Sequence, residues 1–186
     1  FILPLVDIAV STLQELSDRQ FDQFETNVNM LIEADDAIDL FEFTLQKIVK
    51  RHLTPRFRKV SRRAAKFHSI RPVMNDVVCL MSCIAFWGGD NPDEAENAFE
   101  KAMKTLGGGD RYSIAEVESC GLAAADRALS RLVFVVPPIR KRILEASVAC
   151  IAADGYVTPE EAELLRAVAD SLDCPVPPLF ADSAAE

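Results

Sequence analysis

The fold of this chain is decided by a stretch that occurs twice, as CIAFWGGDNPDEAE at residues 83–96 and as CIAADGYVTPEEAE at residues 150–163. Each copy passes from an apolar segment through a glycine-containing turn into a segment that opens with proline and acidic residues. Proline is tolerated in the first turn of a helix, because an N–H at that position would have no helical partner. The repeat therefore predicts two related helix-turn-helix units, at about 73–106 and 138–173.

A third copy stands near the start of the chain, where IEAD at 32–35 matches IAAD at 151–154, and it places a first unit at about 20–53. In each copy an N-cap residue is followed three positions later by glutamate: Asp39 with Glu42, Asn91 with Glu94, and Thr158 with Glu161. We expect capping boxes here, in which the N-cap oxygen accepts the N3 amide and the glutamate accepts the N-cap amide. Cap chemistry would then account for all three glutamates.

Apolar residues elsewhere follow helical spacing, as in Phe24, Val28 and Leu31, and no segment sustains the alternation of a strand. The one strand-like run, residues 132–136, ends at two prolines and can equally be the tail of a helix. We therefore predict an all-α, compact multi-helix bundle of about eight or nine helices. It forms a single domain over residues 1–180, followed by a frayed tail at 181–186.

The composition suits one folded domain, with 49% apolar and 26% charged residues among 186. The longest apolar run, Val77 to Trp87, is shorter than the roughly 20 residues that a membrane-spanning helix needs, so we expect a soluble chain. It opens at Phe1 with no initiator methionine and no signal peptide, which predicts that it was taken from a longer protein.

The five cysteines are odd in number and contain no Cys-x-x-Cys pair, which favours a reducing, cytoplasmic setting. Cys79 and Cys83 lie four apart on an expected helix and could share a metal. With no second pair nearby, we interpret them as small buried side chains.

Charge is strongly segregated in a chain whose net charge is −9. No acidic residue occurs between Glu42 and Asp76, and this interval holds a basic band: Arg51, Arg56, Arg58, Lys59, Arg62, Arg63, Lys66 and Arg71. Such a band on an acidic body predicts a surface for an acidic partner or an anionic lipid headgroup layer. A solvated helix-loop-helix face is the alternative. Nucleic acid is a weaker candidate, because the pI of about 4.8 disfavours contact with a long polyanion.

Acidic turns precede two of the expected caps. Asp35 stands seven residues before Glu42, and Asp154 stands seven before Glu161. If these turns converge, their carboxylates could bind calcium or magnesium, although the spacing is not that of an EF-hand. Turn and cap chemistry is the simpler interpretation.

No catalytic motif is present in the sequence. The two histidines, His52 and His68, lie within the basic band, and there is no His-Glu-x-x-His, no Gly-x-Ser-x-Gly and no Walker-type loop. We therefore expect that this chain has no catalytic site.

The stretch ILEASVACIAADGYVTPEEAELLRAVADSLDCPVPPLF, residues 143–180, resembles the C-terminal end of bacterial membrane-bound zinc metallopeptidases of the HtpX type, where a TerB-like helical region follows the protease. LIEADDAIDLFEFTLQKIVKRHL, residues 31–53, resembles the helix pair that opens that region. The first unit departs from the pattern, with Asp36 where the last unit has Gly155.

The resemblance implies a non-catalytic regulatory or docking domain on the cytoplasmic side of the bacterial inner membrane, with zinc and the His-Glu-x-x-His motif upstream in the parent protease. Its partner would be the rest of that protease, another protein or the anionic membrane surface, met through the basic band. The alternative function is a free-standing TerB-like module that binds a divalent cation or senses stress, with Asp35, Glu42, Asp154 and Glu161 as ligands.

Overall fold

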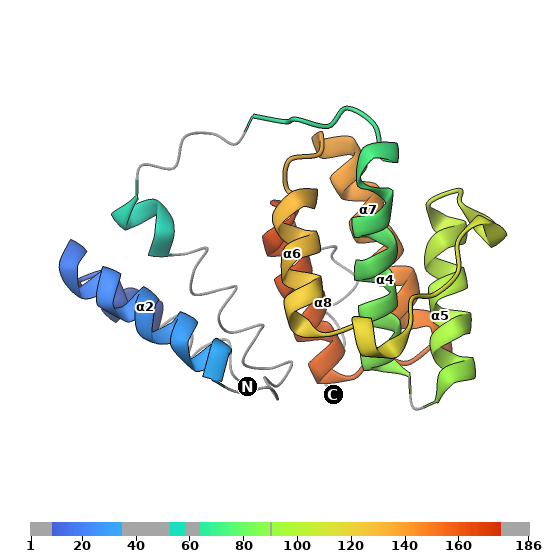
Figure 1. The fold of residues 1–186 in the computed structure, drawn as a ribbon, viewed down its shortest axis with the longest axis horizontal. Helices are drawn as coiled ribbons and strands as arrows, with labels where there is room; N and C mark the ends of the chain where they lie inside the picture. Colours follow the sequence, from blue (N-terminus) through green and yellow to red (C-terminus); the bar gives the residue numbers. More distant parts are fainter. Residues whose placement is uncertain (1–8, 35–52, 59–63, 90, 176–186) are drawn as a thin grey trace. The chain divides into compact units, whose positions relative to one another are not determined.

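A computed structural model describes residues 9–34, 53–58, 64–89 and 91–175 (Figure 1). The regular structure of these residues is helical apart from one isolated bridge, which confirms the all-α, multi-helix prediction. The chain divides into two compact units, Phe1–Arg62 and Arg63–Glu186, here called the N-terminal unit and the C-terminal unit. The predicted single domain over 1–180 stays a prediction, and the predicted tail at 181–186 lies outside the described residues.

The C-terminal unit contains the two clearest copies of the repeat. Its helices are α4 (Met74–Gly88), α5 (Pro92–Thr105), α6 (Leu122–Leu132), α7 (Pro137–Ile151) and α8 (Pro159–Ser171). Short 3-10 helices lie between them: η1 (Arg71–Val73), η2 (Gly109–Arg111), η3 (Val117–Ser119) and η4 (Ala152–Asp154). Helices α4 and α5 occupy the residues of the predicted unit at 73–106, and α7 and α8 occupy those of the unit at 138–173.

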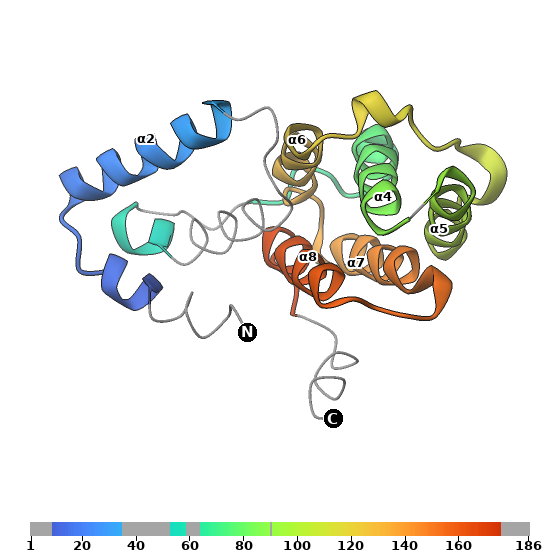
Figure 2. The ribbon, with the colours of Figure 1, turned by 90° about the horizontal axis from the view of Figure 1, so that it is seen from below.

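The core of this unit is built around α4, which packs against α5, α6 and α7. Figure 2 shows the helices nearly end-on, with α6, α4 and α5 in one row and α8 and α7 in a second. Every residue from Leu80 to Ala85 is buried, because α4 has neighbours on several sides. The buried hydroxyl of Ser82 accepts a hydrogen bond from the Ala115 amide at 3.0 Å, so burial leaves this group satisfied.

Three arginine contacts show that the pairs α4–α6, α7–α8 and α5–α7 each run in opposite directions. Arg131, near the end of α6, lies 3.4 Å from a carboxylate oxygen of Asp76 in the first turn of α4. In the first turns of α7, Arg140 donates to the Leu172 carbonyl after α8, and Arg142 donates to the Leu106 carbonyl after α5. Helices α4 and α7 therefore begin at the end of the unit where α5, α6 and α8 finish.

The predicted helix caps are found where the structure describes them. The Asn91 side chain accepts a hydrogen bond from the Glu94 amide at 3.0 Å at the start of α5. At the start of α8, Thr158 and Glu161 form a complete capping box. Proline occupies the first turn of both helices, as the repeat predicted. The first predicted pair, Asp39 with Glu42, lies outside the described residues.

The chain enters the C-terminal unit along a short extended segment. The Lys66 and Phe67 amides both donate to the Phe134 carbonyl, and the Val136 amide donates to the Phe67 carbonyl at 3.0 Å. The strand-like run at 132–136 is thus not a strand, and only its first residue belongs to the tail of a helix. Helix α6 ends at Leu132, and Val135 makes the isolated parallel bridge to Phe67.

The N-terminal unit has a small core of its own. Helix α2 (Asp18–Ala34) is flanked by helical residues at 9–13 and 53–57. Val10, Phe21 and Leu53 form a buried cluster, and the rings of Phe21 and Phe57 stack with their centroids 4.3 Å apart. Among the described residues of both units, no helix combines the length and apolar content that crossing a bilayer requires.

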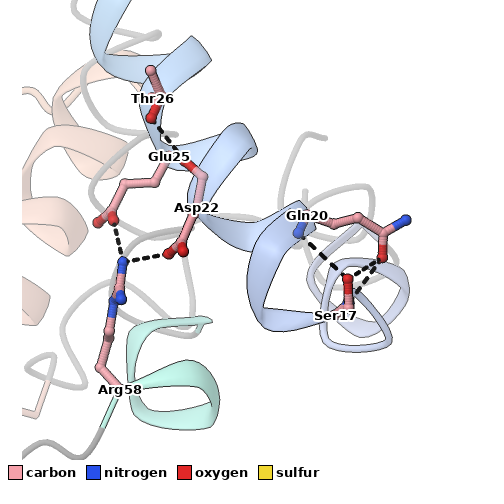
Figure 3. A network of polar contacts seen from close by, with 6 residues as sticks. All are labelled: Ser17, Gln20, Asp22, Glu25, Thr26 and Arg58. Carbon is pink, nitrogen blue, oxygen red and sulfur yellow. Dashed lines mark hydrogen bonds and ion pairs between the residues drawn. The ribbon is translucent and has the colours of Figure 1, made fainter.

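A capping box that the sequence analysis missed begins α2 (Figure 3). The Ser17 amide donates to the Gln20 side-chain oxygen at 2.9 Å, and the Gln20 amide donates to the Ser17 hydroxyl at 3.4 Å. The pattern Ser-x-x-Gln was visible in the sequence, because glutamine can replace glutamate at this position. The three predicted boxes all contain glutamate, so this box was not among them.

We predict that Leu80→Ala lowers the free energy of unfolding of the C-terminal unit by about 2–5 kcal/mol, because it leaves a cavity in the fully buried face of α4. Val117→Ala is the control, since Val117 is 56% exposed, and it should change stability by less than about 0.5 kcal/mol. Urea denaturation followed by circular dichroism measures both values. Equal effects of the two substitutions would contradict the packing described for α4.

Candidate functional site

The basic band crosses the division between the two units, which falls between Arg62 and Arg63. Arg56 and Arg58 are described in the N-terminal unit, and Lys66 and Arg71 are described in the C-terminal unit. The other four predicted members lie outside the described residues: Arg51, Lys59, Arg62 and Arg63. Each unit therefore carries two described members of the band.

Arg58 is bound within its own unit (Figure 3). Its guanidinium lies 2.7 Å from Asp22 and 3.1 Å from Glu25, two carboxylates one helical turn apart on α2, and it stands over the Phe21 ring. The hydrogen bond to Glu25 and the charge of Asp22 raise the pKa of Arg58. Arg58 thus joins the segment after Leu53 to α2, and its charge is largely balanced.

Arg56 and Arg71 are exposed members of the band, one on each unit. The Arg56 guanidinium lies 5.6 Å from the centroid of the adjacent Phe57 ring, which leaves its charge at the surface. Arg71 belongs to η1, directly before α4. These side chains can meet an external anion without breaking a contact of the core.

Lys66 is also exposed, and its backbone is fixed. Its ammonium nitrogen lies 4.4 Å from the centroid of the Phe134 ring, while its amide is bonded to the Phe134 carbonyl at 2.7 Å. A cation held over an aromatic face gains a modest electrostatic attraction. The position of Lys66 next to the end of α6 is therefore well defined.

The antiparallel helices bring further basic residues to the end of the unit where α4 and α7 begin. We call this the basic end, and its members are Lys66, Arg71, Lys104, Arg131, Arg140, Lys141 and Arg142. Cations at helix C-termini are favourable, and Arg140 and Arg142 bond the final carbonyls of α8 and α5. The run Arg140-Lys141-Arg142 is visible in the sequence, but only the structure shows that it lies at the same end of the unit as Lys66.

The opposite end of the C-terminal unit is acidic. There α5, α6 and α8 begin and α4 and α7 finish. Three segments surround these turns, at residues 91–96, 112–123 and 150–163, and none of them contains lysine or arginine. Their acidic members are Asp93, Glu94, Glu96, Glu116, Glu118, Asp154, Glu160, Glu161 and Glu163. Carboxylates stabilise the N-termini of α5 and α8. Negative charge thus predominates at this end and positive charge at the other, where the carboxylates of Asp76, Glu100, Glu145 and Asp173 pair with four of the basic residues.

The predicted cation ligands at this acidic end are engaged in local hydrogen bonds. Asp154 accepts the Tyr156 amide at 2.8 Å across the turn at Gly155, whose φ of +86° suits glycine. One Glu161 oxygen accepts both the amide and the hydroxyl of Thr158, at 2.8 and 2.9 Å. Both residues perform the turn and cap roles that the spacing favoured.

The other two predicted ligands, Asp35 and Glu42, lie outside the described residues. In the part of the chain that the structure describes, no three or more His, Cys, Asp or Glu side chains are grouped as a metal site requires. The calcium or magnesium site stays a prediction.

Glu161 also connects the two helical hairpins. A Cβ atom added to Gly88, the last residue of α4, would lie 2.5 Å from the second carboxylate oxygen of Glu161. Any larger residue at this position therefore requires the flexible end of the Glu161 side chain to shift. The end of α4 therefore lies close to the Glu161 side chain at the start of α8.

Three comparisons with known proteins returned no match. No protein-family model matches the chain, no curated protein is significantly similar to it, and no solved structure is either. The resemblance to a TerB-like region of HtpX-type peptidases stays an expectation from the sequence.

We predict that the effect of Gly88→Ala on stability depends on whether Glu161 is present. In the natural sequence it should destabilise the unit by about 1 kcal/mol, because the new methyl group displaces Glu161 from its cap. In a Glu161→Ala background it should be neutral, or stabilise by up to about 1 kcal/mol, because alanine is the better helix former. A double-mutant cycle of denaturation free energies measures the coupling, and additive effects would contradict the proposed contact.

Proposed function

We propose that this chain is a non-catalytic regulatory or docking domain that binds an anionic surface through the basic end of its C-terminal unit. The anionic headgroup layer of a membrane is the surface that we favour. The observation that carries the proposal is the separation of charge along the helices of that unit, with Lys66, Arg71 and Lys141 exposed at one end.

The separation matters because the chain as a whole is acidic, with a net charge of −9. An acidic protein with evenly spread charge would be repelled by an anionic surface in every orientation. Here the carboxylates at the far turns stand a helix length away from the basic end, and screening at physiological ionic strength weakens charges beyond about 8 Å. Only the approach of the basic end is therefore attractive, so binding is oriented as well as favourable.

The residues at the basic end contribute unequally. Arg140 and Arg142 bond helix-terminal carbonyls, and Arg131 pairs with Asp76, so part of their charge serves the fold. The side chain of Lys141 is 75% exposed and makes only a loose ion pair, 3.8 Å long, with the exposed Glu145. Lys66 and Arg71 lie on the segment that leads into α4. A basic residue near an anionic leaflet contributes about 1 kcal/mol to binding. These three residues are the main contributors in our proposal.

The resemblance to HtpX-type peptidases supports a location next to a membrane. A domain that follows a membrane-bound protease is close to the lipid surface on the cytoplasmic side, where anionic headgroups are found. The basic end would then orient the domain beneath its parent protease. This placement is part of the proposal and rests on residues 31–53 and 143–180.

We predict that the chain sediments with vesicles containing phosphatidylglycerol at low salt, and does not sediment with neutral phosphatidylcholine vesicles. High salt should release it, because the attraction is electrostatic. Equal binding to neutral vesicles, binding that survives high salt, or no binding to anionic vesicles would each contradict the proposal. If the chain instead binds the surface of an acidic protein, we expect no binding to anionic vesicles.

Two charge reversals distinguish the contribution of the basic end to vesicle binding from that of net charge. Arg71→Glu should weaken vesicle binding at least tenfold, since it replaces an attractive charge with a repulsive one. Arg127→Glu is the matched control, because Arg127 is exposed in the middle of α6 and the change in net charge is the same. Circular dichroism verifies that both variants fold. Equal losses would show that total charge, and not the basic end, controls binding.

A further inference from the structure

Three cysteines meet where α4 passes the start of α6. Cys79 and Cys83 lie one turn apart on α4, and Cys120 stands between η3 and α6. The Cys83 sulfur lies 3.9 Å from the carbonyl oxygen of Gly121, the residue that follows Cys120. Neither the proposed surface nor the helix caps use these residues.

Helix geometry excludes one of the three possible pairs, and the position of Cys83 next to Gly121 favours its pairing with Cys120. Side chains four apart on a helix have their Cβ atoms about 5–6 Å apart, whereas a disulfide needs about 3.5–4.5 Å. Cys79 and Cys83 cannot be joined without distorting α4. Cys120 stands at the η3–α6 junction, which packs against α4, and the carbonyl oxygen of its neighbour Gly121 lies 3.9 Å from the Cys83 sulfur.

We propose that Cys83 and Cys120 form a reversible disulfide that links α4 to the start of α6 under oxidising conditions. The oxidant is a small disulfide such as oxidised glutathione. Cys120, 8% exposed at the surface junction, first exchanges with it and releases one glutathione thiol. The Cys83 thiolate then attacks the Cys120 sulfur, the mixed disulfide breaks, and a second glutathione leaves. Two protein thiols are oxidised and one oxidised glutathione is reduced to two thiols.

The environment makes this reaction slow at neutral pH. Burial, more than any other cause, raises the pKa of Cys83, and the neighbouring sulfurs of Cys79 and Cys120 add to the shift. Only the thiolate attacks a disulfide, so the rate of bond formation should rise about tenfold per pH unit between pH 7 and pH 9. Asp76 and Arg127 are the charged groups near Cys79, and they act on that thiol in opposite directions.

The bond would close a loop that contains α5, η2 and η3. A crosslink over such a loop restricts the unfolded chain, and the native packing of Cys83 against the segment of Cys120 and Gly121 limits strain. Oxidation should therefore raise the melting temperature of the C-terminal unit by roughly 10 °C. Reduction with dithiothreitol should reverse the change.

The experiment treats the full chain with oxidised glutathione at pH 8.5, blocks the remaining thiols with iodoacetamide and maps disulfide-linked peptides by mass spectrometry. The expected result is a linked peptide pair that joins Cys83 to Cys120, with a mass loss of about 2 Da. A linked pair through any other cysteine, glutathione adducts alone, or no oxidation would overturn the proposal.

Variants give a second test. Cys120→Ala should abolish both the crosslink and the rise in melting temperature, while Cys79→Ala, the matched control on α4, should retain both. Cys150 is buried, its pKa is raised to about 12 by burial and by the charge of Glu161, and its sulfur contacts the Met81 carbonyl, so it should stay reduced. If Cys120→Ala fails to fold, the peptide map of the natural sequence still decides. A crosslink retained in Cys120→Ala would overturn the assignment.

Discussion

The burial of α4 is the constraint on which the C-terminal unit depends. Its residues from Leu80 to Ala85 are buried without interruption, so α5, α6 and α7 must all pack around it. In that packing α4 and α7 run opposite to α5, α6 and α8, which gathers the helix termini at two ends of the unit. The close approach of Gly88 and Glu161 and the separation of charge follow from this arrangement.

Local helix chemistry explains why the two ends differ in charge. Carboxylates collect where α5 and α8 begin, since they cap or oppose the positive end of the helix dipole, and arginines collect where α5 and α8 finish. In an antiparallel bundle these local preferences add up to a unit-wide polarity. A surface suited to an anionic partner can therefore arise largely from residues that also stabilise the fold, and Lys66, Arg71 and Lys141 extend it.

The sequence was most informative where structure is local. The repeat of 83–96 at 150–163 predicted two hairpins and their caps, because capping depends on residues three apart. It was least informative for contacts across the chain. The pairing of Arg58 with Asp22 spans 36 positions, and the meeting of Lys66 with the end of α6 spans even more. The four band members at 51, 59, 62 and 63, together with Asp35 and Glu42, lie outside the described residues, so part of both candidate sites stays a prediction.

The orientation of the chain on an anionic bilayer tests the central claim most directly. Amide NMR signals can be recorded on vesicles of phosphatidylglycerol that contain a lipid with a gadolinium chelate, whose paramagnetism broadens nearby signals. The account predicts broadening at Lys66, Arg71 and residues 131–136, with residues 91–96 and 156–161 unaffected. Broadening centred on the acidic turns, or equal broadening at both ends, would contradict it.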